Sequence, residues 1–69
     1  MKLDLHGVRH HEVDRLVENF ILLNQEQLPL TIVCGNSQPM IDLVYAVIDR
    51  HNIAPTNMDR YGIILITQI

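Results

Sequence analysis

A chain of 69 residues with a single cysteine, Cys34, has no intramolecular disulfide to hold its fold together. Domains of this size lie near the lower limit for folding without cross-links, so the chain needs a well-packed apolar core, a tight ligand or a partner subunit. Hydrophobic residues make up 48% of the sequence and charged residues 19%, which is typical of a globular protein. We therefore expect residues 1–69 to form a single domain.

No apolar run in the sequence approaches the length of a membrane span. Residues 1–5 read Met-Lys-Leu-Asp-Leu, in which apolar and charged side chains alternate. This segment therefore lacks the apolar stretch of a secretory signal. These features predict a cytoplasmic protein with no membrane partner.

The net charge of −3 argues against a dedicated DNA-binding protein, which usually carries a basic surplus. Residues 1–15 hold equal numbers of basic and acidic side chains, so the negative excess lies in residues 16–69. Three of the four histidines, His6, His10 and His11, also belong to the first segment, and each gains positive charge near an anion. A phosphate therefore meets the least repulsion near the N-terminus, which allows polyanion binding without requiring it.

Two hydrophobic periods divide the chain into strands and helices. Apolar residues first alternate with polar ones, as in a half-buried strand, and then recur at the three- and four-residue spacing of an amphipathic helix. Pro29, Gly35 and Gly62 mark boundaries between these segments. The expected strands cover about residues 2–6, 30–34, 57–60 and 63–67, the expected helices about 10–26 and 38–51, and the expected irregular segment 54–57.

The order strand, helix, strand, helix and then one or two strands indicates an α/β fold with right-handed crossover connections. The first strand carries Lys2, Asp4 and His6 on one face and Leu3 and Leu5 on the other. Because the face with Asp4 and His6 is polar, we expect the helices to cover only the opposite face. The prediction is a two-layer sandwich, in which a small sheet has both helices on one side.

The first two expected strands end near His6 and Cys34, and parallel neighbours bring such carboxyl ends together. The turn of Gly35, Asn36 and Ser37 then opens a helix whose first N–H groups have no intrahelical partner and attract anions. The simpler interpretation is that Gly35 is only a turn residue and Ser37 only a helix N-cap. Cys34 is expected to be a buried structural side chain rather than a nucleophile.

Asp4 and His6 lie two residues apart, which on a strand places both side chains on one face. Such a pair is able to bind a divalent metal, or the carboxylate orients the imidazole as a general acid or base. A surface ion pair is the simpler interpretation of the same spacing. Arg9, His10 and His11 follow directly, and either project from the same end or form a solvated helix start.

The segment Leu3-Asp4-Leu5-His6-Gly7, followed by Glu12 and an apolar helical stripe, resembles the first motif of the Smr (small MutS-related) domain. Cys34-Gly35-Asn36-Ser37 stands where that family has Thr-Gly-x-Gly, with Cys34 and Ser37 in place of the threonine and the second glycine. Gly62, followed by an apolar strand, matches the closing element. The resemblance covers nearly the whole chain and implies a two-layer α/β sandwich of order β-α-β-α-β-β with a small mixed sheet.

The resemblance implies a nucleic-acid endonuclease, because Smr domains are associated with DNA nicking or RNA cleavage, often with divalent-metal dependence. It assigns catalysis by phosphodiester hydrolysis to Asp4 and His6, which would also be the ligands of a divalent cation such as Mg²⁺ or Mn²⁺. It assigns a phosphate-contacting turn to Gly35. The expected contacts to nucleic acid or phosphate are Gly7, Arg9, His10, His11, Gly35, Asn36 and Ser37.

Two alternatives to a nuclease stay open on the sequence alone. The altered second motif favours a DNA- or RNA-binding module without catalysis. The acidic balance and the small core favour a protein-interaction domain, for which a homodimer would cover apolar surface.

Overall fold

The computed structural model describes residues 1–53 and 57–69, so the expected irregular segment lies, except for its last residue, outside the described part of the chain. The elements follow one another as β1 (Lys2–Asp4), α1 (His10–Leu23), β2 (Leu30–Val33), α2 (Gln38–Arg50), β3 (Asn57–Arg60) and β4 (Ile63–Ile66). The expected order β-α-β-α-β-β is confirmed. Within the described residues, neither helix is long and apolar enough to cross a membrane.

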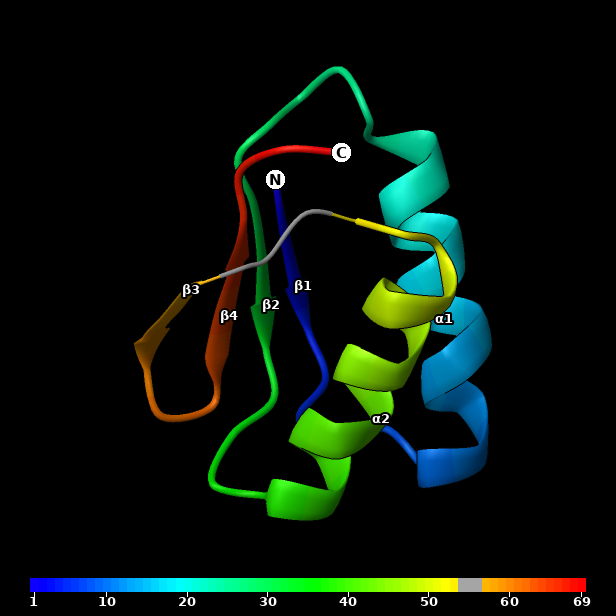
Figure 1. Cartoon of the computed structure of the whole chain (residues 1–69). Coiled ribbons are helices and arrows are strands. Elements are labelled where there is room, and N and C mark those ends of the chain that lie inside the picture. The colour runs from blue at the N-terminus through cyan, green and yellow to red at the C-terminus, as the bar shows by residue number, and fades with distance from the viewer. Residues whose placement is uncertain (54–56) are drawn as a thin grey trace.

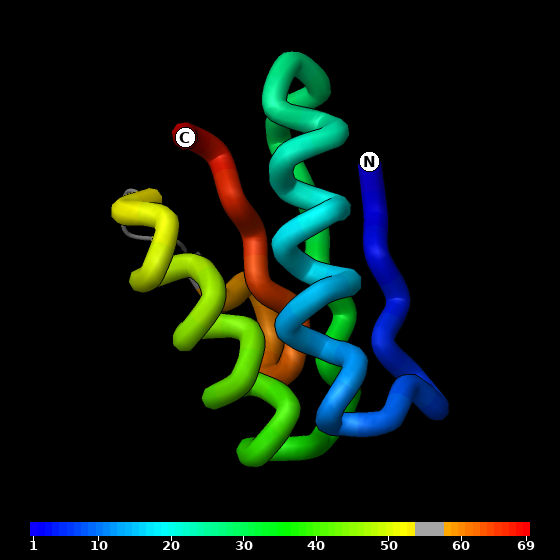
Figure 2. Tube along the Cα trace, turned by 90° about the vertical axis from the view of Figure 1, so that its right-hand side faces the viewer, coloured from blue at the N-terminus to red at the C-terminus, as the bar shows by residue number. Residues whose placement is uncertain are grey.

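The four strands form one mixed sheet in the order β1-β2-β4-β3 (Figure 1). β1 and β2 are parallel, whereas β4 is antiparallel to both of its neighbours, β2 and β3. Both helices lie on the same side of the sheet, and the view turned by 90° shows them side by side in front of it (Figure 2). The expected two-layer sandwich with helices on one face is thereby confirmed.

The core lies between the sheet and the two helices. On β4, Ile64 and Ile66 are fully buried while Ile63 and Leu65 are only partly buried, as expected for a strand with one covered face. Every buried side chain among the described residues is apolar, and each such burial is worth roughly 1.5–3 kcal/mol. The buried helical residues are Val13, Val17 and Ile21 on α1, and Met40, Ile41, Val44, Val47 and Ile48 on α2.

Several elements end earlier than the sequence predicts, and β1 and α1 differ most. β1 stops at Asp4 because the carboxylate of this residue accepts the backbone N–H of His6 at 2.9 Å and turns the chain. α1 ends at Leu23, where the side-chain amide of Asn24 donates to the carbonyl oxygen of Phe20 at 2.7 Å and satisfies one of the last carbonyls of the helix. β2 and β4 each end one residue before the expected boundary.

The turn between β3 and β4 packs directly against the turn that follows β2. Gly62 has a φ of +87°, and a Cβ atom built on it would lie 2.9 Å from the carbonyl carbon of Gly35. The carbonyl oxygen of Gly62 also accepts a hydrogen bond from the N–H of Cys34 at 2.6 Å. Both the backbone conformation and the neighbouring turn therefore exclude a side chain at position 62.

We expect Gly62→Ala to lower the free energy of unfolding by about 3 kcal/mol, because it combines a left-handed backbone with a clash against main-chain atoms. Gly7→Ala is the matched control. Gly7 also has a positive φ, +76°, but nothing lies within 4 Å of its Cβ position, so the expected loss is about 1 kcal/mol. Urea unfolding followed by circular dichroism measures both, and equal losses would contradict the contact between the turns.

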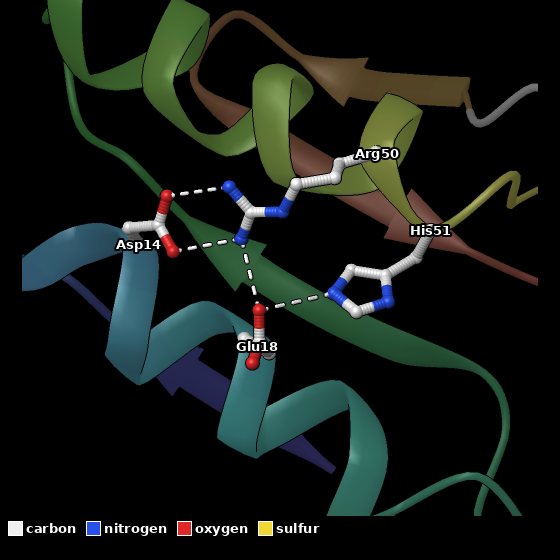
Figure 3. A network of polar contacts seen from close by, with 4 residues as sticks. All are labelled: Asp14, Glu18, Arg50 and His51. Carbon is white, nitrogen blue, oxygen red and sulfur yellow. Dashed lines mark hydrogen bonds and ion pairs between the residues drawn. The ribbon is translucent and has the colours of Figure 1, made fainter.

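A cluster of ionisable side chains, the helix clamp, joins α1 to the end of α2 (Figure 3); it consists of Asp14, Glu18, Arg50 and His51. The guanidinium of Arg50 donates to both carboxylate oxygens of Asp14, at 2.8 and 2.7 Å, and to Oε2 of Glu18 at 2.9 Å. Nε2 of His51 lies 3.2 Å from the same Glu18 oxygen. The clamp is open to solvent, so its contribution to stability is small and depends on salt.

The clamp makes part of the stability depend on pH. The hydrogen bonds from Arg50 lower the pKa of Asp14, and His51 together with Arg50 lowers the pKa of Glu18. A carboxylate whose pKa is lowered by folding contributes stability above its ordinary pKa, here 3.8 for Asp and 4.5 for Glu, and loses it as the pH falls through the lowered value.

We expect Arg50→Gln to lose part of this acid sensitivity, because the substitution removes the main cause of the lowered pKa of Asp14. Thermal unfolding between neutral pH and about pH 3 measures the effect. The melting temperature of the variant should fall less steeply than that of the wild type below the ordinary carboxyl pKa values. Parallel curves for the two proteins would show that the clamp does not form in solution.

Candidate functional site

Several segments that are distant in the sequence end at one pole of the molecule. The carboxyl ends of β1 and β2, the first turns of α1 and α2, and the turn between β3 and β4 all lie at the lower end of the molecule in Figure 1. This is the edge at which α/β sheets place their ligands, because the loops after parallel strands meet there.

Asp4 holds His6 through two contacts to one carboxylate oxygen. Oδ1 accepts the backbone N–H of His6 at 2.9 Å and lies 2.7 Å from Nδ1 of the imidazole. The backbone hydrogen bond is the largest cause of the lowered pKa of Asp4, followed by the contact with the ring. In the tautomer that carries its proton on Nδ1, the ring donates to the carboxylate and Nε2 keeps a free lone pair.

The other edge of the imidazole lies against Gly35. A Cβ atom at position 35 would stand 3.0 Å from Nε2 and 3.3 Å from Cδ2 of His6, and Gly35 has a φ of +74°. The absence of a side chain at Gly35 therefore lets the ring approach the turn between β2 and α2. The structure brings Asp4, His6 and Gly35 together as the strand-end argument predicts; we call these three residues the candidate site.

The start of α2 offers fewer N–H groups than the sequence suggests. Ser37 is the N-cap, as expected, and its hydroxyl accepts the N–H of Met40 at 3.3 Å, so this hydroxyl is already engaged. Pro39 has no N–H, and the N–H of Ile41 donates to the carbonyl oxygen of Ser37 at 3.0 Å. In the first turn of the helix, only the N–H of Gln38 is left for a ligand.

The turn itself adds donors beside the imidazole. Among the described residues, no hydrogen bond engages the N–H groups of Gly35, Asn36 or Ser37. Gln38 follows them at the positive end of the α2 dipole, which is the end of a helix that favours a bound anion.

Of the remaining expected contacts, Gly7 lies in the turn after β1 and the other three lie at the start of α1. Arg9 is its N-cap residue and makes no side-chain cap, while His10 and His11 stand exposed in the first turn. No described hydrogen bond or ion pair joins them to Asp4 or His6. Basic side chains at the positive end of a helix dipole are unfavourable for the helix but favourable for a bound anion.

The sequence did not indicate Tyr61 and Gln38 as part of this pole. The hydroxyl of Tyr61 donates to Oε1 of Gln38 at 2.9 Å, which ties the β3–β4 turn to the start of α2. The side chain of Tyr61 is 55% exposed and is therefore accessible to a ligand. In the sequence, Tyr61 could have been recognised by its position directly before Gly62, the glycine that packs on the neighbouring turn.

The two expected metal ligands do not form a complete donor set. Oδ1 of Asp4 is engaged by His6, so the pair offers one further carboxylate oxygen and Nε2, which faces Gly35. Within the described residues, no group of three or more His, Cys, Asp or Glu side chains gathers at any point. Mg²⁺ and Mn²⁺ prefer a larger set of oxygen ligands, so the residues present do not by themselves fit such a cation.

Two further features are not part of the candidate site, although the first of them, Cys34, directly precedes Gly35. Cys34 is 3% exposed, and burial raises the pKa of its thiol to about 11, which agrees with the expected structural role. A shallow hollow of about 350 Å³ lies beside the end of α1, lined by Leu22, Leu23 and residues 25–27. The end of α1 lies at the opposite pole of the molecule from the carboxyl ends of β1 and β2 (Figure 1).

No protein-family model, curated protein or solved structure matches this chain. The candidate site is therefore the structural basis for inferring a function, and the resemblance to the Smr domain stays a prediction from the sequence.

We expect His6→Ala to raise the pKa of Asp4 only part of the way to its ordinary value of 3.8. The substitution removes the ring contact but keeps the backbone N–H, which is the larger cause of the shift. Carbon-13 NMR titration of the Asp4 carboxyl group measures both proteins. A complete return to 3.8, or no change at all, would contradict the paired contacts described above.

Proposed function

We propose that this protein is a small nucleic-acid endonuclease of the Smr type, which cleaves a phosphodiester bond at the candidate site. One observation carries the proposal: the imidazole of His6 is oriented by Asp4 on one edge and lies against the Gly35 turn with the other. A carboxylate–imidazole pair beside a run of free amides combines a general base with an anion site. The motif resemblance adds support from the sequence.

In the proposed reaction the phosphate rests on the amides of residues 35–38. Nε2 of His6 takes the proton of an attacking water as its oxygen forms a bond to phosphorus, and Asp4 stabilises the resulting imidazolium. The bond from phosphorus to the leaving oxygen breaks, and that oxygen takes up a proton from solvent while the imidazolium of His6 releases its proton to solvent. The amides and the α2 dipole stabilise the extra negative charge on the phosphate oxygens.

The start of α1 supports the approach of the polymer. Arg9, His10 and His11 are exposed at the same pole as the candidate site, and the guanidinium of Arg9 attracts a phosphate. We propose the cytoplasm as the place of action, as the sequence predicts, and the free and buried thiol of Cys34 agrees with it without deciding it.

A second function, nucleic-acid binding without cleavage, is favoured by one observation. The hydroxyl of Ser37 is occupied as a helix cap and Pro39 provides no N–H, so the anion site is smaller than a full helix start. Such a module would bind DNA or RNA with strong salt dependence and leave the strands intact.

We expect His6→Ala to lower the rate of cleavage at least 100-fold, because it removes the general base. The measurement uses supercoiled plasmid and structured RNA, each with and without Mg²⁺ or Mn²⁺. His51→Ala is the matched control, since it removes the imidazole of the helix clamp and leaves the candidate site untouched.

Circular dichroism establishes that both variants are folded. Full cleavage by His6→Ala would disprove the catalytic assignment. Salt-sensitive binding by the wild type without any strand scission would replace the nuclease with the binding module.

A further inference from the structure

The sheet face opposite the helices, here the open face, has no covering element among the described residues. It is apolar at its centre, where Val33 of β2 and Ile63 and Leu65 of β4 are only partly buried. A four-stranded sheet with an uncovered apolar centre exposes surface that an association would remove from water. The open face carries Lys2 and Asp4 on β1, Thr31 and Val33 on β2, Ile63 and Leu65 on β4, and Arg60 on β3.

The strand register sets charged residues at the two edges of one row. Asp4 is opposite Val33, Val33 is opposite Ile63, and Ile63 is opposite Arg60. The row therefore runs from an acidic side chain on edge strand β1, through two apolar side chains, to a basic side chain on edge strand β3. The irregularity between Met58 and Arg60 keeps Arg60 in this row.

We propose that a second copy of this chain covers the open face, with the two-fold axis running parallel to the strands. This operation reverses the strand order and keeps the position along each strand, so β1 of one copy lies over β3 of the other. Asp4 then faces Arg60 of the second copy, twice by symmetry, and Val33 faces Ile63 of the second copy. Aligned stacking of two sheets with small twist is a common way to bury such faces.

The size of the face sets the strength of the association. Four strands about 4.8 Å apart and four residues at about 3.3 Å each give an area of roughly 19 by 13 Å. This is smaller than the roughly 800 Å² per partner of a stable complex, so the dimer forms only at high protein concentration. The charge pairs act on the orientation of the two copies more than on the strength of the dimer, and an axis across the strands would pair Asp4 with Lys2 instead of Arg60.

The proposed dimer has a consequence for the candidate site. His6 follows Asp4 at the carboxyl end of β1, just beyond the charged row. The guanidinium of Arg60 from the second copy is therefore brought next to Asp4, and both candidate sites lie at the same end of the dimer. The assembly itself does not depend on the proposed nuclease activity, because it is measured without nucleic acid.

The test uses two charge reversals and their mixture. Asp4→Arg places like charges against Arg60 in its own dimer, and Arg60→Asp does the same against Asp4. In an equimolar mixture, the heterodimer has opposite charges at both contacts. Sedimentation velocity at protein concentrations up to about millimolar measures association. We expect each variant alone to bind itself at least tenfold more weakly than the wild type does. We expect the mixture to recover the wild-type affinity.

Two further variants separate this face from other surfaces. Leu65→Lys puts a charge at the apolar centre and should keep the protein monomeric, with its fold checked by circular dichroism. Leu23→Asp alters the most exposed apolar side chain at the opposite pole, which is 81% exposed, and should leave association unchanged.

Three results would overturn the proposal. The first is a wild type that stays monomeric at millimolar concentration. The second is either a mixture of the two charge reversals that fails to associate or an Arg60→Asp variant that associates normally. Normal association of Arg60→Asp would indicate a dimer whose two-fold axis runs across the strands and places Asp4 over Lys2. The third is loss of association in Leu23→Asp.

Discussion

The structure depends on the close approach of other segments to the backbone of Gly35. The turn at Gly62 packs on its main-chain atoms, and the imidazole of His6 occupies the space where a side chain would be. The first contact fixes the β3–β4 hairpin against the end of β2. The second joins the end of β1 to the start of α2. One position without a Cβ atom therefore joins three parts of the chain and builds the candidate site.

Much of this arrangement follows from local pattern. The change from a two-residue hydrophobic period to a helical one predicts where strands and helices alternate. The polar face of β1 explains why both helices lie on one side of the sheet. The convergence of His6 and Gly35 follows from topology, because the ends of parallel neighbours must meet. Ser37 as N-cap and Cys34 as a buried thiol follow from the usual chemistry of these residue types.

Other features could not be predicted, because they depend on side-chain geometry between distant residues. The hydrogen bond between Arg50 and Asp14 joins residues 36 positions apart in the sequence, and the one between Tyr61 and Gln38 joins residues 23 positions apart. No sequence motif predicts either contact. The early end of β1 has a similar origin. The alternation of Lys2 to His6 predicts a longer strand, but the carboxylate of Asp4 competes for the N–H of His6 and stops it.

The place of β4 in the sheet determines the order in which the fold can assemble. β4 lies between β2 and β3 in the sheet. Among the described residues, edge strand β3 pairs only with β4, which follows it along the chain. The pairing of β4 with β2 joins positions about half the chain length apart, which is a slow step in folding because a long loop must close first. The parallel β1–β2 unit with α1 is therefore the part that can form early, and the β3–β4 turn that packs on Gly35 is added last.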